Sequence, residues 1–243
     1  MEKNTEIVVA HYCEDLEWLR PYAKNVIIYH KWHEDKPRFP VKKWIKLDNV
    51  WRESHTYLYH IVNNYNTLSD VTIFLQWWVD DHRNDWLAYW NLDEYEKETK
   101  NHRFSTRRLW ILLRRKNQIK MWWKFLEALN KWDLKKSKYT FSEFYKYFFK
   151  KGQPLILPVF YAANFWVDRK NILKKDKSFY IELMELCSES SNPEEWHFME
   201  RLRFSIFNEK ISFHFFWKIL RNPFLWIYFR LKALMKWILK RNR

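Results

Sequence analysis

The sequence is almost without glycine: it contains 1 glycine among 243 residues. A globular domain of this length carries about 17 at the usual frequency of ~7 %. Tryptophan is abundant instead, with 17 residues, and Trp32 and Trp132 stand in polar, turn-like stretches where a positive φ would favour glycine. Some bacterial lineages read UGA as glycine, so we hypothesise that many of these tryptophans are UGA codons translated with the wrong code table. The alternative is a genuinely Trp-rich protein.

Other missing patterns exclude several classes of site. The sequence holds no P-loop, no nucleophile elbow, no complete GxGxxG motif and no zinc signature. Its 2 cysteines, Cys13 and Cys187, have no metal or redox spacing, which excludes a disulfide framework and indicates a reducing compartment. No uncharged apolar run reaches about 18 residues, so we expect no transmembrane helix. The polar start, followed by a short apolar run, predicts no signal peptide.

The net charge of +15 is concentrated in two segments. Residues 211–243 hold eight Lys and Arg and no acid, and residues 100–151 hold sixteen against three acids. The rest of the chain is net acidic. This distribution favours local contact with an anionic surface or with polyphosphate groups, and it argues against a generally basic coat for nucleic acid.

Apolar residues make up 47 % of the chain, enough for a sizeable core. The apolar runs are short and helical stretches separate them, which predicts an α/β fold: a mostly parallel central sheet flanked by helices. We expect one domain over residues 1–210, with a variable, helical, basic insert at about 100–151. The expected strands cover residues 7–12, 26–29, 45–47 and 71–75, with one or two more in 155–167. The expected helices cover residues 14–24, 49–63, 107–129, 141–149, 168–174, 178–188 and 193–207.

The C-terminal segment, residues 211–243, has its own pattern. Apolar residues alternate with cations, and Lys232, Lys236, Lys240 and Arg243 fall on one side of a helix opposite a broad apolar face. A basic face opposite an apolar one is typical of a helix that lies on an anionic membrane, so we expect amphipathic membrane-surface helices here. The alternative is a terminal helix that packs on the core and keeps a solvated cationic face.

The strongest candidate site follows the strand expected at 71–75. Asp80, Asp81 and His82 come just after its carboxyl end, where ligands bind in open α/β sheets. Carboxylates there would hold Mg²⁺ or Mn²⁺ against a diphosphate, because these cations prefer oxygen ligands. The alternative is a solvated acidic turn that caps the next helix.

The end of the first strand offers a second group of candidates. His11, Tyr12 and Glu14 are placed to contact a nucleotide, although this stretch also suits a helix N-cap with acids favoured by the dipole. Arg52 opens the helix after Asn49 and adds a cation to an end that binds anions. A surface ion pair with Glu53 is the alternative for Arg52.

One more pair lies in the last expected helix. Glu200 suits a general base or a ligand of an acceptor hydroxyl, with Arg201 beside it. A structural ion pair explains the two residues as well.

Several segments together resemble the uncharacterised family called domain of unknown function 3431. The block NVWRESHTYL at 49–58 is the most specific, because the family pattern runs NVGREAHTYL. The resemblance spans about residues 6–208. The family pattern has glycine at the positions where this chain has Trp32, Trp51 and Trp77, which strengthens the recoding hypothesis. Trp18 matches a family tryptophan, and Cys13 replaces a family asparagine. The supporting blocks are VAHYCEDLEWL at 9–19, IYHKW at 28–32, FLQW at 74–77 with Asp81 and His82, ANFWVDR at 163–169, Phe179-Tyr180 and Glu200-Arg201-Leu202.

The family looks like a glycosyltransferase of the GT-A type, and the resemblance implies a corresponding site. Asp80 and Asp81 would hold the metal and diphosphate, Arg52 would meet a phosphate or sugar, and Glu200 would orient or deprotonate the acceptor hydroxyl. The expected catalytic residues are Asp81, Glu200 and His82. The expected substrate-binding residues are His11, Tyr12, Glu14, Arg52, Glu53, His55, Gln76, Asn164 and Arg201.

The sequence therefore predicts a peripheral glycosyltransferase on the cytoplasmic face of the inner membrane. Its expected partners are a nucleotide-sugar donor, a polysaccharide or lipid-linked acceptor, a divalent cation, and an anionic membrane surface bound through 211–243. A non-catalytic module that binds glycan or lipid head groups is the main alternative. A nucleic-acid binder using residues 103–151 is a third hypothesis, and we expect no nucleic-acid partner.

Overall fold

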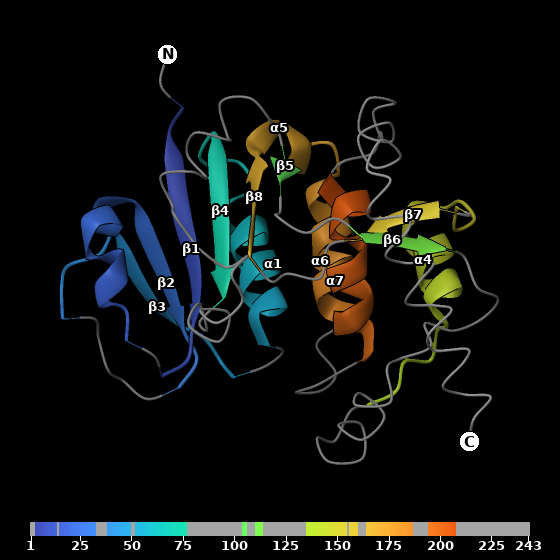
Figure 1. Cartoon of the computed structure of the whole chain (residues 1–243), viewed down its shortest axis with the longest axis horizontal. Coiled ribbons are helices and arrows are strands. Elements are labelled where there is room, and N and C mark those ends of the chain that lie inside the picture. Colours follow the sequence, from blue (N-terminus) through green and yellow to red (C-terminus); the bar gives the residue numbers. More distant parts are fainter. Residues whose placement is uncertain are drawn as a thin grey trace, which may run out of the picture. The chain divides into compact units, whose positions relative to one another are not determined.

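The computed structural model, drawn in Figure 1, divides the chain into two compact units, Met1–Phe207 and Asn208–Arg243. The residues that the structure describes all belong to the first unit. No helix among them is long and apolar enough to cross a membrane. The described ranges are 3–13, 15–32, 38–49, 52–76, 104–105, 110–113, 135–154, 156–159, 164–186 and 194–207.

A six-stranded sheet with the strand order β3-β2-β1-β4-β8-β5 is the centre of the fold. Its first four strands along that order are parallel, whereas β8 runs antiparallel to β4 and β5 antiparallel to β8. The prediction of an α/β fold with a mostly parallel sheet is therefore confirmed. The strands are β1 (Thr5–His11), β2 (Val26–His30), β3 (Lys43–Lys46), β4 (Val71–Gln76), β5 (Phe104–Ser105) and β8 (Phe165–Asp168).

Helices pack on both faces of this sheet (Figure 1). A 3₁₀ helix, η1 (Glu17–Asn25), follows β1, and α1 (Arg52–Asn64) connects β3 to β4. A separate two-stranded antiparallel sheet joins β6 (Trp110–Leu113) to β7 (Ile156–Val159), and α7 contacts β7. The remaining helices are α4 (Phe141–Phe149), α5 (Arg169–Ile172), α6 (Lys177–Leu186) and α7 (Glu194–Phe207).

The alternation of side chains along β1 separates the two faces of the sheet. Ile7 and Val9 lie in an apolar cluster with Leu19 of η1, and we call this side the η1 face. The intervening residues of β1, which include Glu6, lie on the side of α1, where Glu6 contacts His60. We call this second side the α1 face. Both faces are covered, which explains why β1, β2 and β4 are buried almost throughout.

Two expected helices differ in the structure. The segment expected at 14–24 is a 3₁₀ helix from Glu17 because Pro21 lies inside it and cannot donate the backbone hydrogen bond of an α-helix. The helix expected over 107–129 is wrong at Trp110–Leu113, which forms strand β6. This apolar run pairs with β7, a partner distant in the sequence, and tertiary pairing overrides the local helical preference.

The backbone at Trp32 also corrects an expectation. Within the described part of the chain, the non-glycine residue with a positive φ is Lys150, at 52°, which ends α4 in the left-handed conformation. The left-handed turn expected at Trp32 is therefore wrong. The conformation of Trp32 gives no steric reason for glycine, so the recoding hypothesis depends on the family pattern and composition.

Candidate functional site

Four parallel strands end at one edge of the sheet, which we call the carboxyl edge. The chain moves from β1 to β2 and β3 on one side, then returns to place β4 on the other side of β1. The strand order therefore reverses between β1 and β4, which lie side by side in Figure 1. In open α/β sheets, ligands bind in the crevice beyond the carboxyl ends at such a point. The residues that end these strands are His11, His30, Lys46 and Gln76.

Two histidines meet on the η1 face of this edge. His11 and His30 are paired in register on β1 and β2, and their Nδ1 atoms lie 2.9 Å apart. One imidazole must donate to the other at this contact, so the pair holds at least one neutral ring. The ring of His30 also stacks on Trp44 of β3, with 4.8 Å between the ring centroids. These contacts fix both rings where a ligand at the edge would approach.

A buried lysine lies on the α1 face of the same edge. Lys31 directly follows β2, its side chain approaches Glu53 of α1, and the residue is 7 % exposed. Burial lowers the pKa of Lys31 to about 7, although the charge of Glu53 acts in the opposite direction. The ammonium and the amine are therefore both populated near neutral pH.

His55 of α1 is the third ionisable group of the cluster. Burial, followed by the charge of Lys31, lowers the pKa of His55 to about 4, and Asp48 opposes these effects. His55 is therefore a neutral imidazole at pH 7. Glu53, one helical turn before Tyr57, is buried and supplies the negative charge. The expected residues Glu53 and His55 are thus brought together, and Lys31 joins them.

The carboxyl end of β4 is closed by an asparagine. Asn164 is 1 % exposed, and its Oδ1 accepts a hydrogen bond from the backbone N–H of Gln76 at 2.6 Å. Because β8 is antiparallel to β4, the residue before β8 lies at the carboxyl end of β4. Two residues expected to bind substrate, Gln76 and Asn164, are therefore in contact, and Asn164 positions the backbone of Gln76.

An aromatic pair extends the carboxyl edge toward solvent. Tyr12 follows β1 and Trp32 lies two residues after β2, with their ring centroids 4.6 Å apart. Trp32 is 44 % exposed, which is unusual for so large an apolar side chain. Tyr12 was expected from the sequence to contact substrate, and the structure places it directly after the last residue of β1, with its ring against Trp32.

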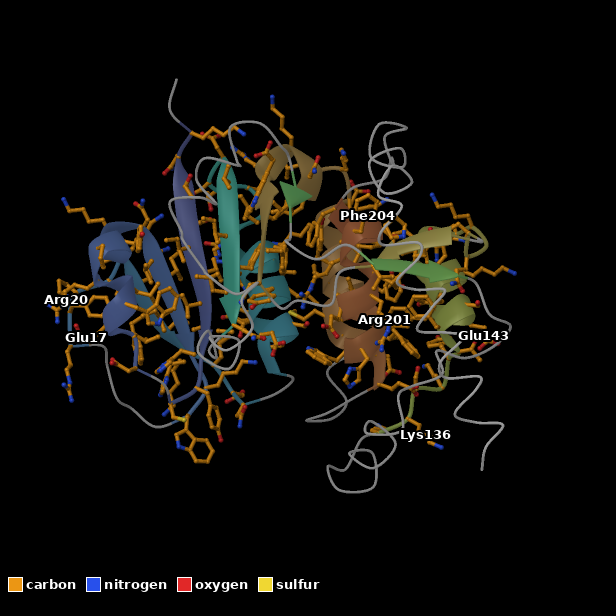
Figure 2. The ribbon with its side chains drawn as sticks, in the orientation of Figure 1. Glu17, Arg20, Lys136, Glu143, Arg201 and Phe204 are labelled. Carbon is orange, nitrogen blue, oxygen red and sulfur yellow. The ribbon has the colours of Figure 1, made fainter. Side chains whose placement is uncertain are left out.

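The residues expected on the last helix have a different arrangement. Arg201 donates through Nη1 to the backbone carbonyl of His197 on its own helix, at 2.6 Å, and Figure 2 shows it on α7 with Phe204. The guanidinium of Arg203 lies 4.9 Å from the centroid of the Phe165 ring and 5.9 Å from that of Tyr57. Arg203 is therefore a cation that α7 brings to the sheet and to α1. Glu200 is partly buried on the same helix.

Tyr57 is influenced by the charges of both Arg203 and Glu53. Its side chain is buried, and burial together with the charge of Glu53 raises the pKa of the Tyr57 phenol, while Arg203 acts in the opposite direction. The phenol is neutral at all ordinary pH values. Glu53 of α1 therefore acts electrostatically on both Lys31, which follows β2, and Tyr57 of its own helix, and the charge of Arg203 of α7 opposes its effect on Tyr57.

Some expected site residues lie outside the described residues. These are Glu14, Asp80, Asp81 and His82, and for Arg52 the backbone of α1 alone is described. The described residues contain no group of three or more His, Cys, Asp or Glu side chains that would hold a metal ion. The prediction of a divalent cation rests on the oxygen ligands of Asp80 and Asp81, and it stays a prediction.

Three residues of the edge were missed in the sequence: His30, Lys31 and Arg203. The first two follow the rule that selected His11, since they end or follow a buried strand. Arg203 carries no comparable local signal, because its importance depends on how α7 packs against α1. The available sequence signal for Arg203 was that it is a cation within an apolar stretch of the helix.

Comparison with known proteins gives a family and no function. A family model described as protein of unknown function (DUF3431) matches residues 7–213. No curated protein matches the chain, and neither does any solved structure.

Proposed function

The chain belongs to the DUF3431 family, and from that premise we propose that it is a GT-A-type glycosyltransferase. It transfers a sugar from a nucleotide-diphosphate donor to a polysaccharide or lipid-linked acceptor at the inner membrane face. The observation that carries the proposal is the carboxyl edge, where polar side chains from β1, β2, α1 and the start of β8 gather at the reversal of strand order. The order β3-β2-β1-β4 also matches the first four strands of the doubly wound order 3-2-1-4-5-6, which binds dinucleotides where the order reverses.

The donor site has two parts under this proposal. His11 and Tyr12 flank the nucleotide at the end of β1, with the pairing to His30 holding the first ring in place. The diphosphate lies toward the first turn of α1, because a helix N-terminus attracts negative charge. Gln76 leads into the segment that contains Asp80 and Asp81, and Asn164 fixes its backbone at the edge. A divalent cation at these two acids would neutralise the departing diphosphate.

The transfer needs one base and one leaving group. The acceptor hydroxyl oxygen bonds to the anomeric carbon of the donor sugar, and the bond from that carbon to the diphosphate oxygen breaks. The electron pair leaves with the nucleoside diphosphate, and the hydroxyl proton passes to a carboxylate base. Glu200 is the residue that we assign to this base, with His82 as the second candidate acid or base from the sequence.

A thermal-shift screen of nucleotide-diphosphate sugars, with and without Mn²⁺, tests the proposal. A donor present at about 100 times its Kd adds about 2.7 kcal/mol to the free energy of unfolding, which raises Tm measurably. We expect stabilisation by one nucleotide class, greater with Mn²⁺, followed by transfer of the labelled sugar to a membrane extract. Folded protein that responds to no donor and transfers no sugar would overturn the proposal.

Two variants separate an enzyme from a module that only binds. Asp81→Asn should abolish metal-dependent stabilisation and sugar transfer while the protein stays folded. Asp176→Asn is the matched control, because Asp176 is exposed between α5 and α6, away from the carboxyl edge. The binding module would be favoured by two results together. The unmodified protein would transfer no sugar, and both it and Asp81→Asn would bind glycan equally well without a donor.

A further inference from the structure

We propose that Lys31 binds the donor's diphosphate as an ammonium ion, so that donor binding takes up a proton. The inference rests on the proposed function, because it names the residue that receives the donor's negative charge. The proposed function has a cation at Asp80 and Asp81 neutralise the diphosphate. This inference adds the ammonium of Lys31 as a second positive charge, one that belongs to the protein.

The backbone holds Lys31 rigidly at the carboxyl edge. The N–H of Lys31 donates to the carbonyl of His11 at 3.1 Å, and the carbonyl of His30 accepts from the N–H of Leu47 at 2.8 Å. The chain at this point is therefore tied to β1 on one side and to the residue after β3 on the other. Because His30 faces Trp44 on the η1 face, Lys31 points to the α1 face. The backbone of Lys31, and therefore the direction in which its side chain leaves the chain, is fixed before any ligand arrives.

The surroundings of Lys31 favour a further anion. Burial disfavours the ammonium, and the carboxylate of Glu53 offsets that effect in part. His55 lies on the same helix and is neutral at pH 7, and Asp48, which acts on His55, is exposed to solvent. The side chain of His11 turns to the η1 face, toward His30. A diphosphate beyond the edge would add negative charge close to the amine and restore its proton.

The N-terminus of α1 acts in the same direction. This helix begins at Arg52 and has 13 residues, so its first turn carries the positive end of a full helix dipole. The dipole attracts a diphosphate. Glu53 lies in this first turn and acts on Lys31, so a diphosphate drawn to the helix end would lie near the lysine.

The proposal gives proton uptake a definite dependence on pH. The free amine of Lys31 titrates with a pKa of about 7, so most molecules lack this proton at pH 8 and most carry it at pH 6. Bound diphosphate raises that pKa, and each complex formed at pH 8 takes up nearly one proton. At pH 6 the uptake is close to zero. The diphosphate of a nucleotide sugar is a diester, whose phosphates stay ionised over this range and contribute no proton of their own.

Isothermal titration calorimetry measures this uptake. UDP-glucose and GDP-mannose are titrated into the full chain at pH 6 and pH 8, each in two buffers of different ionisation enthalpy. The dependence of the observed heat on the buffer gives the number of protons taken up. We expect nearly one proton at pH 8 and almost none at pH 6 for the donor that binds.

Substitutions at Lys31 show which group takes up the proton. Lys31→Met should weaken donor binding about ten- to hundred-fold, the range for loss of a hydrogen bond to a charged group, and should abolish the uptake. Lys31→Arg keeps a permanent charge, so it should bind the donor with almost no uptake at either pH. Lys43→Met is the matched control, because Lys43 is exposed and begins β3, at the opposite edge of the parallel strands. Circular dichroism establishes that each variant is folded.

The outcomes distinguish the two proposals. The role of Lys31 is overturned if the donor binds at pH 8 without proton uptake, or if Lys31→Met binds the donor as tightly as the unmodified protein. Either result leaves the glycosyltransferase proposal standing. If neither donor nor any other nucleotide-diphosphate sugar binds the folded protein at either pH, both proposals fail together.

Discussion

Glu6 is a buried carboxylate that the fold keeps ionised. Its Oε1 accepts a hydrogen bond from Nε2 of His60 at 3.2 Å, and Nζ of Lys42 lies 3.5 Å from its Oε2. Burial by itself raises the pKa of Glu6, but the hydrogen bond and charge of His60, with the charge of Lys42, outweigh it and hold the pKa below its usual value. Nδ1 of His60 lies 3.0 Å from the hydroxyl of Tyr29, which extends the network to β2.

Glu6→Gln should lower the free energy of unfolding at pH 7 by about 1.5–3 kcal/mol, the range for hydrogen bonds to charged groups. Because the pKa of Glu6 is lower in the folded state, its contribution is present above the unfolded pKa of about 4.3 and is lost as the pH falls through the folded value. The difference between the variant and the unmodified protein should therefore shrink on acidification. Urea unfolding at pH 7 and at pH 3 measures both differences.

Asp70→Asn is the control for this prediction. Asp70 is exposed and accepts a hydrogen bond from the backbone N–H of Asn4, so its loss should change stability by less than that of Glu6. A Glu6→Gln effect of the same size at both pH values would show that the carboxylate is not what stabilises the network.

The residue at position 32 tests the recoding hypothesis. Under it, protein isolated from the native organism carries glycine where the printed sequence has the exposed Trp32. Mass spectrometry of the peptide containing position 32 should then give a mass lower by the difference between tryptophan and glycine. The gene's codons at Trp32, Trp51 and Trp77 provide an independent check, and UGG at all three excludes recoding there.

A local rule was enough to place one of the candidate residues. His11 was chosen because it ends a buried strand, and the structure places it at the carboxyl edge together with Gln76, which came from the family pattern. Arg203 was missed because its contacts with Tyr57 and Phe165 depend on the packing of α7, which no nearby residue encodes. Arg201 was preferred for its family motif, whereas its described hydrogen bond stays within α7.

Helix α4 begins with a capping box. The side chain of Thr140 accepts from the N–H of Glu143, whose carboxylate accepts from the N–H of Thr140 (Glu143 is labelled in Figure 2). The box fixes the start of a helix whose inner side buries Phe141, Phe144, Tyr145 and Phe148. Sequence periodicity alone gave the correct bounds of this helix, because the cap and the apolar side agree.

Thr140→Ala should lower the free energy of unfolding by about 1 kcal/mol, because it removes the oxygen that caps the helix. Thr140→Ser keeps that oxygen and is the matched control, so it should stay within about 0.5 kcal/mol of the unmodified protein. Urea denaturation followed by circular dichroism measures both. Equal stability of the alanine and serine variants would contradict a stabilising cap.

At the scale of elements, local patterns predicted the central strands and failed at distant pairings. Buried apolar runs gave β1, β2 and β4 to within a residue or two. The pairing of Trp110 with Val159 turned an expected helix into strand β6. The antiparallel direction of β8 beside β4 was likewise not predicted, since a four-residue strand does not encode its partner. That direction is what brings Asn164 to Gln76.

At the scale of the whole molecule, the proposed nucleotide site at the sheet edge is accompanied by two basic segments of the sequence. Residues 100–151 and 211–243 carry the excess positive charge, and the prediction of membrane attachment concerns the second of them. Attachment would place the proposed donor site at the surface where lipid-linked acceptors are found. The two segments can be separated experimentally because each contains lysines spaced closely in the sequence.

Binding to vesicles should depend on the C-terminal lysines. The full chain is expected to cosediment with vesicles that contain phosphatidylglycerol, and not with vesicles of phosphatidylcholine alone. Each lysine near an anionic surface contributes about 1 kcal/mol, so the triple variant Lys232→Gln, Lys236→Gln and Lys240→Gln should weaken binding about hundred-fold. The matched control is Lys135→Gln, Lys136→Gln and Lys138→Gln, three exposed lysines of the other basic segment. If the control weakens binding as strongly as the C-terminal variant, the attraction to the vesicles arises from the net charge of the protein. The C-terminal segment is then not a specific membrane anchor.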